Sequence, residues 1–79
     1  MDNKTETENL ITEIKANTIQ FILLAEKMIQ YKSKKYLTET EKVDYFRTAT
    51  DLITVKEQGD KIALELMALL DIIKNQNNG

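Results

Sequence analysis

The sequence predicts an all-α fold, an antiparallel helical hairpin, on three observations. Proline is absent from the 79 residues and glycine occurs only at Gly59 and Gly79, so the strongest helix breakers are almost missing. Apolar residues recur at steps of three and four, the spacing of one helix face. The motif Thr-Glu-Thr-Glu occurs at 5–8 and again at 38–41, each time before an apolar run, as at a helix start. We therefore expect one helical domain, 1–79.

The first predicted helix runs from about residue 5 to residue 31. Thr5 and Glu8 have the spacing of a capping box, in which the two side chains accept hydrogen bonds from backbone N–H groups of the first turn. The apolar arc of this helix is broader than contact with one neighbouring helix requires, and Asn17 interrupts its main stripe. That stripe comprises Leu10, Ile14, Phe21, Leu24, Met28 and Tyr31.

The predicted connection is 32–37, with the sequence KSKKYL, which carries charge without helical periodicity. Its length is usual for a helix–helix link, and short links make antiparallel neighbours. The second predicted helix begins at Thr38, which forms a capping box with Glu41, and extends to about residue 76. We expect residues 77–79 to be a frayed tail.

The stretch around Gly59 leaves two architectures open. Apolar positions keep nearly one coiled-coil phase across it, and Glu57 and Lys61 form an opposite-charge pair spanning it, so we favour one long helix that can kink there. Against continuity, the apolar arcs before and after the glycine differ by on the order of 100°, whereas supercoiling accounts for about 20° per heptad. A helix broken at Gly59 gives a three-helix bundle instead.

The residue inventory excludes most catalytic chemistry. Histidine and cysteine are absent and Ser33 is the sole serine, so nucleophilic triads and His- or Cys-based metal sites lack their groups. Glu41 and Asp44 share a helical face, and we interpret them as capping and solvated charge rather than an acid–base pair. We expect no enzyme activity, no cofactor and no bound metal.

Positive charge concentrates in the middle of the chain. Residues 27–42 carry five lysines against two glutamates, while the whole chain has a net charge of −2. We interpret this stretch first as a solvated loop whose tyrosines close the end of the core, and second as a patch for an acidic partner. Nucleic acid is not favoured, because the stretch lacks arginine and the rest of the chain is acidic. The candidate patch comprises Lys27, Tyr31, Lys32, Lys34, Lys35 and Tyr36.

The broad apolar arc of the first helix and the off-stripe apolar side chains Leu64, Met67 and Ile72 of the second helix predict an interface. A lone chain of this length buries a modest share of its surface, and without disulfides self-association is the remaining route to stability. We therefore expect a homo-oligomer, with a dimer favoured, in which hairpins associate into a larger helical bundle. The candidate oligomer or partner interface comprises Phe21, Leu24, Met28, Leu64, Met67 and Ile72.

These observations favour a non-enzymatic interaction module that binds another protein and regulates or inhibits it. One alternative is a nucleic-acid-associated regulator that uses the lysine-rich tip of the hairpin. The other is an immunity or anti-defence factor of a phage or mobile element. In size and helical character the chain is similar to small immunity proteins, antitoxins and phage-encoded inhibitors. Its Lys-, Asn-, Ile-, Glu- and Thr-rich composition resembles that of AT-rich bacterial or phage genomes.

The sequence also predicts where the protein resides. The acidic, polar start lacks the positively charged region of a secretory signal. The apolar run at 21–25 is far too short to span a bilayer and is followed by Glu26 and Lys27. We expect a cytoplasmic protein without a membrane span.

Overall fold

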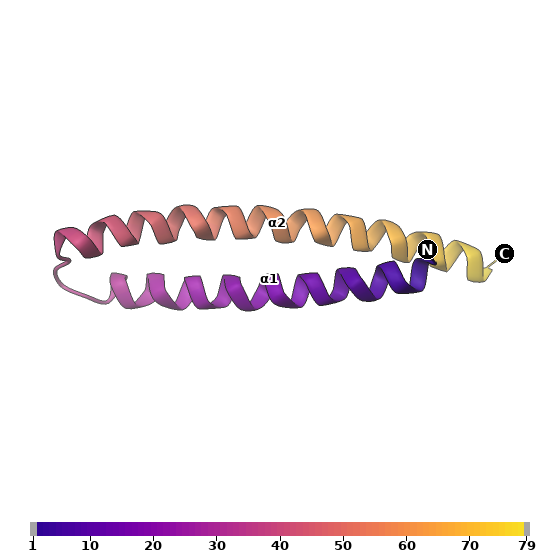
Figure 1. Ribbon diagram of the computed structural model, residues 1–79, viewed down its shortest axis with the longest axis horizontal. Coiled ribbons are helices and arrows are strands. Elements are labelled where there is room, and N and C mark those ends of the chain that lie inside the picture. Colours follow the sequence, from indigo (N-terminus) through magenta and orange to yellow (C-terminus); the bar gives the residue numbers. More distant parts are fainter. Residues whose placement is uncertain (1, 79) are drawn as a thin grey trace.

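The computed structural model describes residues 2–78, which form two helices packed side by side along their length. Helix α1 spans Asn3–Lys32 and helix α2 spans Glu39–Asn78. The connection lies at one end of an elongated molecule of 61 × 19 × 14 Å, and both chain termini lie at the other (Figure 1). The prediction of an all-α helical hairpin is confirmed. No strand occurs within the described residues, and the three-helix alternative is wrong.

The start of α1 differs from the prediction. The carboxylate of Asp2 accepts a hydrogen bond from the Thr5 N–H at 2.7 Å, and Asp2 has the extended backbone of an N-cap residue. This bond holds the pKa of the Asp2 carboxyl below its usual value. The predicted capping box of Thr5 and Glu8 is therefore wrong, because Thr5 already lies in the first turn. A cap one turn earlier supplies the same acceptor and adds a turn of helix.

The start of α2 confirms the second capping box. Thr38 Oγ1 accepts from the Glu41 N–H at 3.1 Å, and Glu41 Oε1 accepts from the Thr38 N–H at 2.9 Å. Two backbone donors of the first turn are thereby satisfied reciprocally. At its other end α2 continues to Asn78, so residues 77 and 78 are helical rather than frayed, and residue 79 lies outside the described residues.

Helix α2 passes through Gly59 without a break, as the coiled-coil phase predicted. No glycine of the described chain has a positive φ. A Cβ at Gly59 would lie 2.5 Å from Asn17 Oδ1, and Asn17 Nδ2 donates to the Val55 carbonyl at 2.9 Å. The glycine therefore leaves the space that the Asn17 side chain fills. Asn17 and Gly59, which interrupt the apolar pattern of the sequence, therefore lie against each other and form one polar layer between the helices.

The contact between the helices is a thin core. Among residues 2–76 only Val55 and Thr48 are buried, and the Thr48 hydroxyl donates to the Asp44 carbonyl at 2.7 Å. The other contact residues are half-buried at alternating steps of three and four, the spacing of a coiled-coil seam. On α1 they include Leu10, Ile14, Asn17, Phe21, Leu24, Met28 and Tyr31; on α2 they include Tyr45, Leu52, Gly59, Ile62, Leu66, Leu69 and Ile73.

Candidate interaction site

Two shallow grooves run between the helices, one on each broad side of the hairpin. One groove is bordered by Thr18 of α1 and by Lys56, Asp60 and Ala63 of α2. The opposite groove is bordered by Glu13, Ala16, Gln20, Gln58, Lys61 and Glu65. Because residues three, four or seven apart share a helix face, these borders assign the neighbouring side chains to one side or the other.

Large apolar side chains gather on the side of Thr18 and Ala63. They follow these border residues at one- and two-turn steps along both helices, and they are exposed by between 37% at Ile11 and 69% at Phe46. Ala25 and Ala49 lie between them and are half-buried. This surface, called the apolar face below, comprises Ile11, Ile22, Ile29, Phe46, Ile53, Met67 and Leu70.

A short polar segment divides the apolar face in two. Lys56 and Asp60 form an ion pair at 2.9 Å, which raises the pKa of the Lys56 ammonium. Lys15 and Thr18 lie on the same side of α1, level with the layer of Asn17 that crosses the hairpin. We call these four residues, Lys15, Thr18, Lys56 and Asp60, the waist. Toward the connection lie Ile22, Ile29, Phe46 and Ile53, and toward the termini lie Ile11, Met67 and Leu70.

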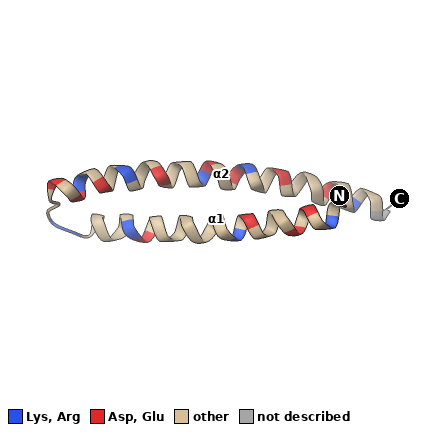
Figure 2. Ribbon diagram, in the orientation of Figure 1, with Lys and Arg blue, Asp and Glu red and all other residues tan. Residues whose placement is uncertain are grey.

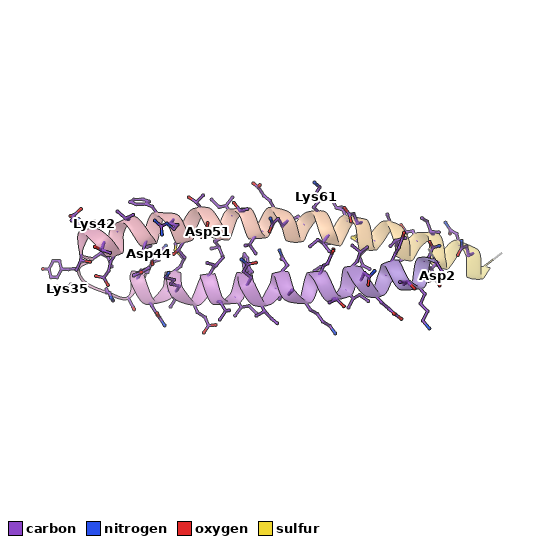
Figure 3. All side chains as sticks on the ribbon, in the orientation of Figure 1. Asp2, Lys35, Lys42, Asp44, Asp51 and Lys61 are labelled. Atoms are coloured by element: carbon purple, nitrogen blue, oxygen red, sulfur yellow. The ribbon has the colours of Figure 1, made fainter. Side chains whose placement is uncertain are left out.

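The opposite side carries mostly charged and amide side chains. Figure 3 shows Lys61 pointing away from α1, and Asp44 lies close enough to Lys27 of α1 for an ion pair at 2.7 Å. Leu23 and Ile72 are the exposed apolar exceptions on this side. This surface, called the polar face below, comprises Glu6, Glu13, Gln20, Lys27, Asp44, Asp51, Gln58, Lys61 and Glu65.

The connection end of the hairpin holds a bonded cluster around Asp44. The Asp44 carboxylate accepts from Lys27 and from the Tyr31 hydroxyl, and in that order these bonds lower the pKa of the Asp44 carboxyl. The Asp44 contact raises the pKa of the Tyr31 phenol. The Tyr31 ring meets Tyr45 edge to face, with ring centroids 6.2 Å apart. Tyr31 thus closes the end of the core, as our first interpretation of the lysine-rich stretch expected, but that interpretation is wrong for Tyr36, which is exposed.

Two of the four lysines of the predicted patch, Lys27 and Lys34, are paired with carboxylates. Lys34 pairs with Glu41, which lowers the pKa of that carboxyl, and Lys42 pairs with Glu39 at 3.2 Å. Lys35 lies over the ring of Tyr36, at 5.9 Å from its centroid. Blue and red segments consequently alternate at this end of the ribbon (Figure 2). Lys32 ends α1, and Tyr36 in the connection is 81% exposed. Binding of an acidic partner here stays a prediction.

The residues of the predicted interface fall in different places. Phe21, Leu24 and Met28 are half-buried against α2, inside the hairpin rather than on an open surface. The other three are exposed, Leu64 by 67%, Met67 by 61% and Ile72 by 46%. Met67 alone lies on the apolar face, since Ile72 follows Glu65 by seven residues and Leu64 points outward by helical periodicity. Contact of these residues with another protein stays a prediction.

Sequence reasoning missed most of the apolar face. Ile53, Leu70 and Ile11 were absent from the predicted interface, although each flanks a residue of the contact stripe. The sequence does contain this information in its spacing. Each of these three residues lies one or three positions along the chain from a residue of the coiled-coil seam, and all three lie on the same flank of that seam. Finding the apolar face requires the register between the two helices, which decides that the flanks of α1 and α2 share a side.

Within the described residues no three acidic side chains lie close enough together to hold a metal ion, in a chain without histidine or cysteine. Neither helix has, within that same part, an apolar stretch long enough to cross a membrane.

No family model matches this chain, and no curated protein and no solved structure matches it significantly.

Proposed function

We propose that this chain is a non-enzymatic interaction module that binds another protein through its apolar face and regulates or inhibits it. The single observation that supports this proposal is the gathering of exposed apolar side chains on one broad side of the hairpin, opposite a charged side. Soluble monomers rarely leave contiguous apolar patches of more than a few hundred Å² uncovered, and such patches mark interaction sites.

The shape of the apolar face indicates the chemistry of its partner. Two antiparallel helices with a groove between them accept the side-chain ridges of a further helix. The partner surface is therefore a helix or helix pair with an apolar stripe at steps of three and four residues. Polar side chains of the partner meet the waist, because Lys56 and Asp60 would otherwise lose water without replacement.

The ion pairs at the connection end weaken the nucleic-acid alternative. Lys27, Lys34 and Lys42 each have a carboxylate partner, and those carboxylates would repel phosphate. An immunity or anti-defence factor would be one instance of the proposed inhibition, and no observation on this chain favours it over other targets.

The proposal is tested by affinity capture from cells that produce the protein. Ile53 and Leu23 are matched sites, 59% and 62% exposed, on the apolar face and the polar side respectively. We expect the wild type and the Leu23→Glu variant to recover the same partner, and the Ile53→Glu variant to lose it. Recovery of that partner by the Ile53→Glu variant would refute the proposal.

A further inference from the structure

We infer that a second copy of this chain covers the apolar face, packed head to tail, so that two hairpins form an antiparallel four-helix bundle. This inference rests on the proposed function only in taking the apolar face as the docking surface: the second copy covers that face in the free protein, and the partner protein displaces it on binding. Three observations carry it: the exposed area, the opposite charges of the two ends, and the sizes of the facing side chains.

The exposed area of the single hairpin matches one side of a dimer interface. The chain exposes 6255 Å², whereas a compact monomer of 9.1 kDa exposes about 4,900 Å². The excess, roughly 1,350 Å², lies between the ~800 Å² per partner of a standard interface and the larger values of obligate homodimers. Since Val55 and Thr48 are the only buried residues among 2–76, a second layer of helices supplies the core that the single chain lacks.

The two ends of the hairpin carry opposite charge, which selects a head-to-tail arrangement. Residues 27–47, at the connection end, hold six basic and three acidic side chains. Residues 2–15 and 63–76, at the terminal end, hold six acidic and three basic ones. Head-to-tail packing places a net charge of about +3 over a net charge of about −3 at both ends of the bundle. Head-to-head packing would instead stack like charges.

The waist is compatible with the head-to-tail arrangement. In the head-to-tail dimer the two-fold axis crosses the waist and lays α2 against α2 of the second copy. Lys56 then faces Asp60 of the second copy, and Asp60 faces its Lys56. The exposed Lys56–Asp60 pair within one chain thus extends into a four-charge cluster at the axis. In the head-to-head dimer α2 lies over α1 of the second copy, and the register of the hairpin, with Asn17 against Gly59, brings Lys15 of the second copy beside Asp60. The charges of the two ends, rather than the waist, therefore select the head-to-tail arrangement.

The side-chain sizes on α2 are complementary about this axis. In the head-to-tail dimer a residue of α2 on one side of the waist meets the residue of α2 of the second copy that lies equally far from the waist on its other side. Ala49 then faces Met67 of the second copy, and Ile53 faces its Ala63. In these two layers a large side chain lies opposite a small one, which lets facing helices interdigitate at the density of a protein interior, and Phe46 meets Leu70 of the second copy in the next layer.

The orientation is tested by mixing two charge-reversal variants. In the head-to-tail dimer Lys56→Asp creates two Asp–Asp contacts, and Asp60→Lys creates two Lys–Lys contacts. We expect each variant alone to dimerise at least tenfold more weakly than the wild type. An equimolar mixture should recover the wild-type affinity within about threefold, because both facing pairs become attractive again. A mixture that dimerises no more tightly than the separate variants overturns the head-to-tail arrangement.

Disulfide trapping provides a second measurement, and the chain has no cysteine of its own. Ile53 and Ala63 are ~15 Å apart along α2, so a double-cysteine variant of these two sites can form a disulfide only between chains. We expect the I53C/A63C variant to form a covalent dimer on oxidation. The matched I22C/I53C variant, whose sites meet between chains only head to head, should not. The reverse result overturns the inference.

These outcomes separate the inference from the proposed function. A wild-type chain that stays monomeric at micromolar concentration overturns the dimer and leaves partner binding through the apolar face intact. A head-to-tail dimer whose Ile53→Glu variant still captures the same partner overturns the proposed function and leaves the dimer intact.

Discussion

The apolar and polar faces are made from the same two helices, yet they differ in almost every side chain. On one flank of the contact stripe the exposed side chains are isoleucine, phenylalanine and methionine, and on the other flank they are mostly glutamate, glutamine and lysine. The contact stripe itself is continuous and explains why the chain forms a hairpin. It does not explain the apolar face, whose side chains contribute little to packing between α1 and α2. The proposed four-helix bundle accounts for this difference, because a second hairpin buries the apolar face and leaves the polar face in water.

The largest expected effect compares a charge on each face. Ile53→Glu places a carboxylate inside the proposed bundle without a partner and should lower the free energy of unfolding by about 3 kcal/mol or more. Leu23→Glu, at a site of similar exposure on the polar side, should change it by no more than about 0.5 kcal/mol. Urea denaturation at fixed protein concentration measures both. Equal effects would mean that the two faces are equivalent.

A second comparison probes the polar layer beneath both faces. Gly59→Ala improves helix propensity by ~1 kcal/mol, but its Cβ collides with the Asn17 amide and displaces its bond to Val55. We expect Gly59→Ala to destabilise the wild type by about 1 kcal/mol and to stabilise the Asn17→Ala variant by up to about 1 kcal/mol. Urea denaturation of the four chains gives the coupling energy. Additive effects would show that the two residues act independently.

A third comparison concerns the two ends of the hairpin. Lys35→Glu lowers the net charge of the connection end by two and leaves both faces unchanged. At low salt we expect it to weaken the head-to-tail dimer about threefold, with a smaller effect in 0.5 M salt, where charges are screened beyond about 4 Å. Sedimentation across a salt series measures this. A dimer that Lys35→Glu strengthens at low salt would contradict the charge argument.

The smallest expected effect is a pH dependence from the lowered carboxyl pKa values. Asp2, Glu41 and Asp44 all have folded-state pKa values below their usual ones. Each therefore contributes stability that is present above about pH 4–5 and is lost as the pH falls through the folded value. Thermal unfolding between pH 6 and pH 2.5 should show a small decline. Asp44→Asn should reduce the slope, and a steeper decline in that variant would contradict the assignment.

The raised pKa of the Tyr31 phenol gives a contribution to stability with the opposite pH dependence. The neutral phenol donates to Asp44, so this contribution is present below the usual tyrosine pKa near 10 and is lost as the pH rises through the folded value. Tyr31→Phe should remove that alkaline component. Ultraviolet titration of the phenols measures it, and a titration identical to that of free tyrosine would contradict the bond.

The sequence predicts where the chain is helical better than it predicts which side chains are exposed. Continuity through Gly59 followed from the unbroken phase of the apolar stripe, because a glycine facing a neighbouring helix does not alter the helical repeat. The first helix start was placed one turn late, since Asp2 and Thr5 are both capping residues. Local sequence cannot choose between caps one turn apart when the side chain of each can accept from the backbone N–H three residues on.

In the structure some residues of the predicted interface are covered by the other helix and others are exposed, and the sequence does not contain the information that decides between the two. Phe21 and Leu24 turned out to face α2, whereas Ile53 and Leu70 lie in the open. All four are apolar and stand near the same stripe. Only the register between the helices, set in part by Asn17 fitting over Gly59, decides which apolar residues the hairpin covers.

The central claim is that the apolar face is covered by a second copy of the chain, and sedimentation equilibrium of the purified protein at micromolar concentration tests it most directly. Circular dichroism on the same sample establishes that the helices are formed. The account predicts a helical species of about 18 kDa, twice the chain mass of 9.1 kDa. A fully helical species of 9.1 kDa, stable on dilution and unchanged by Ile53→Glu, would contradict it.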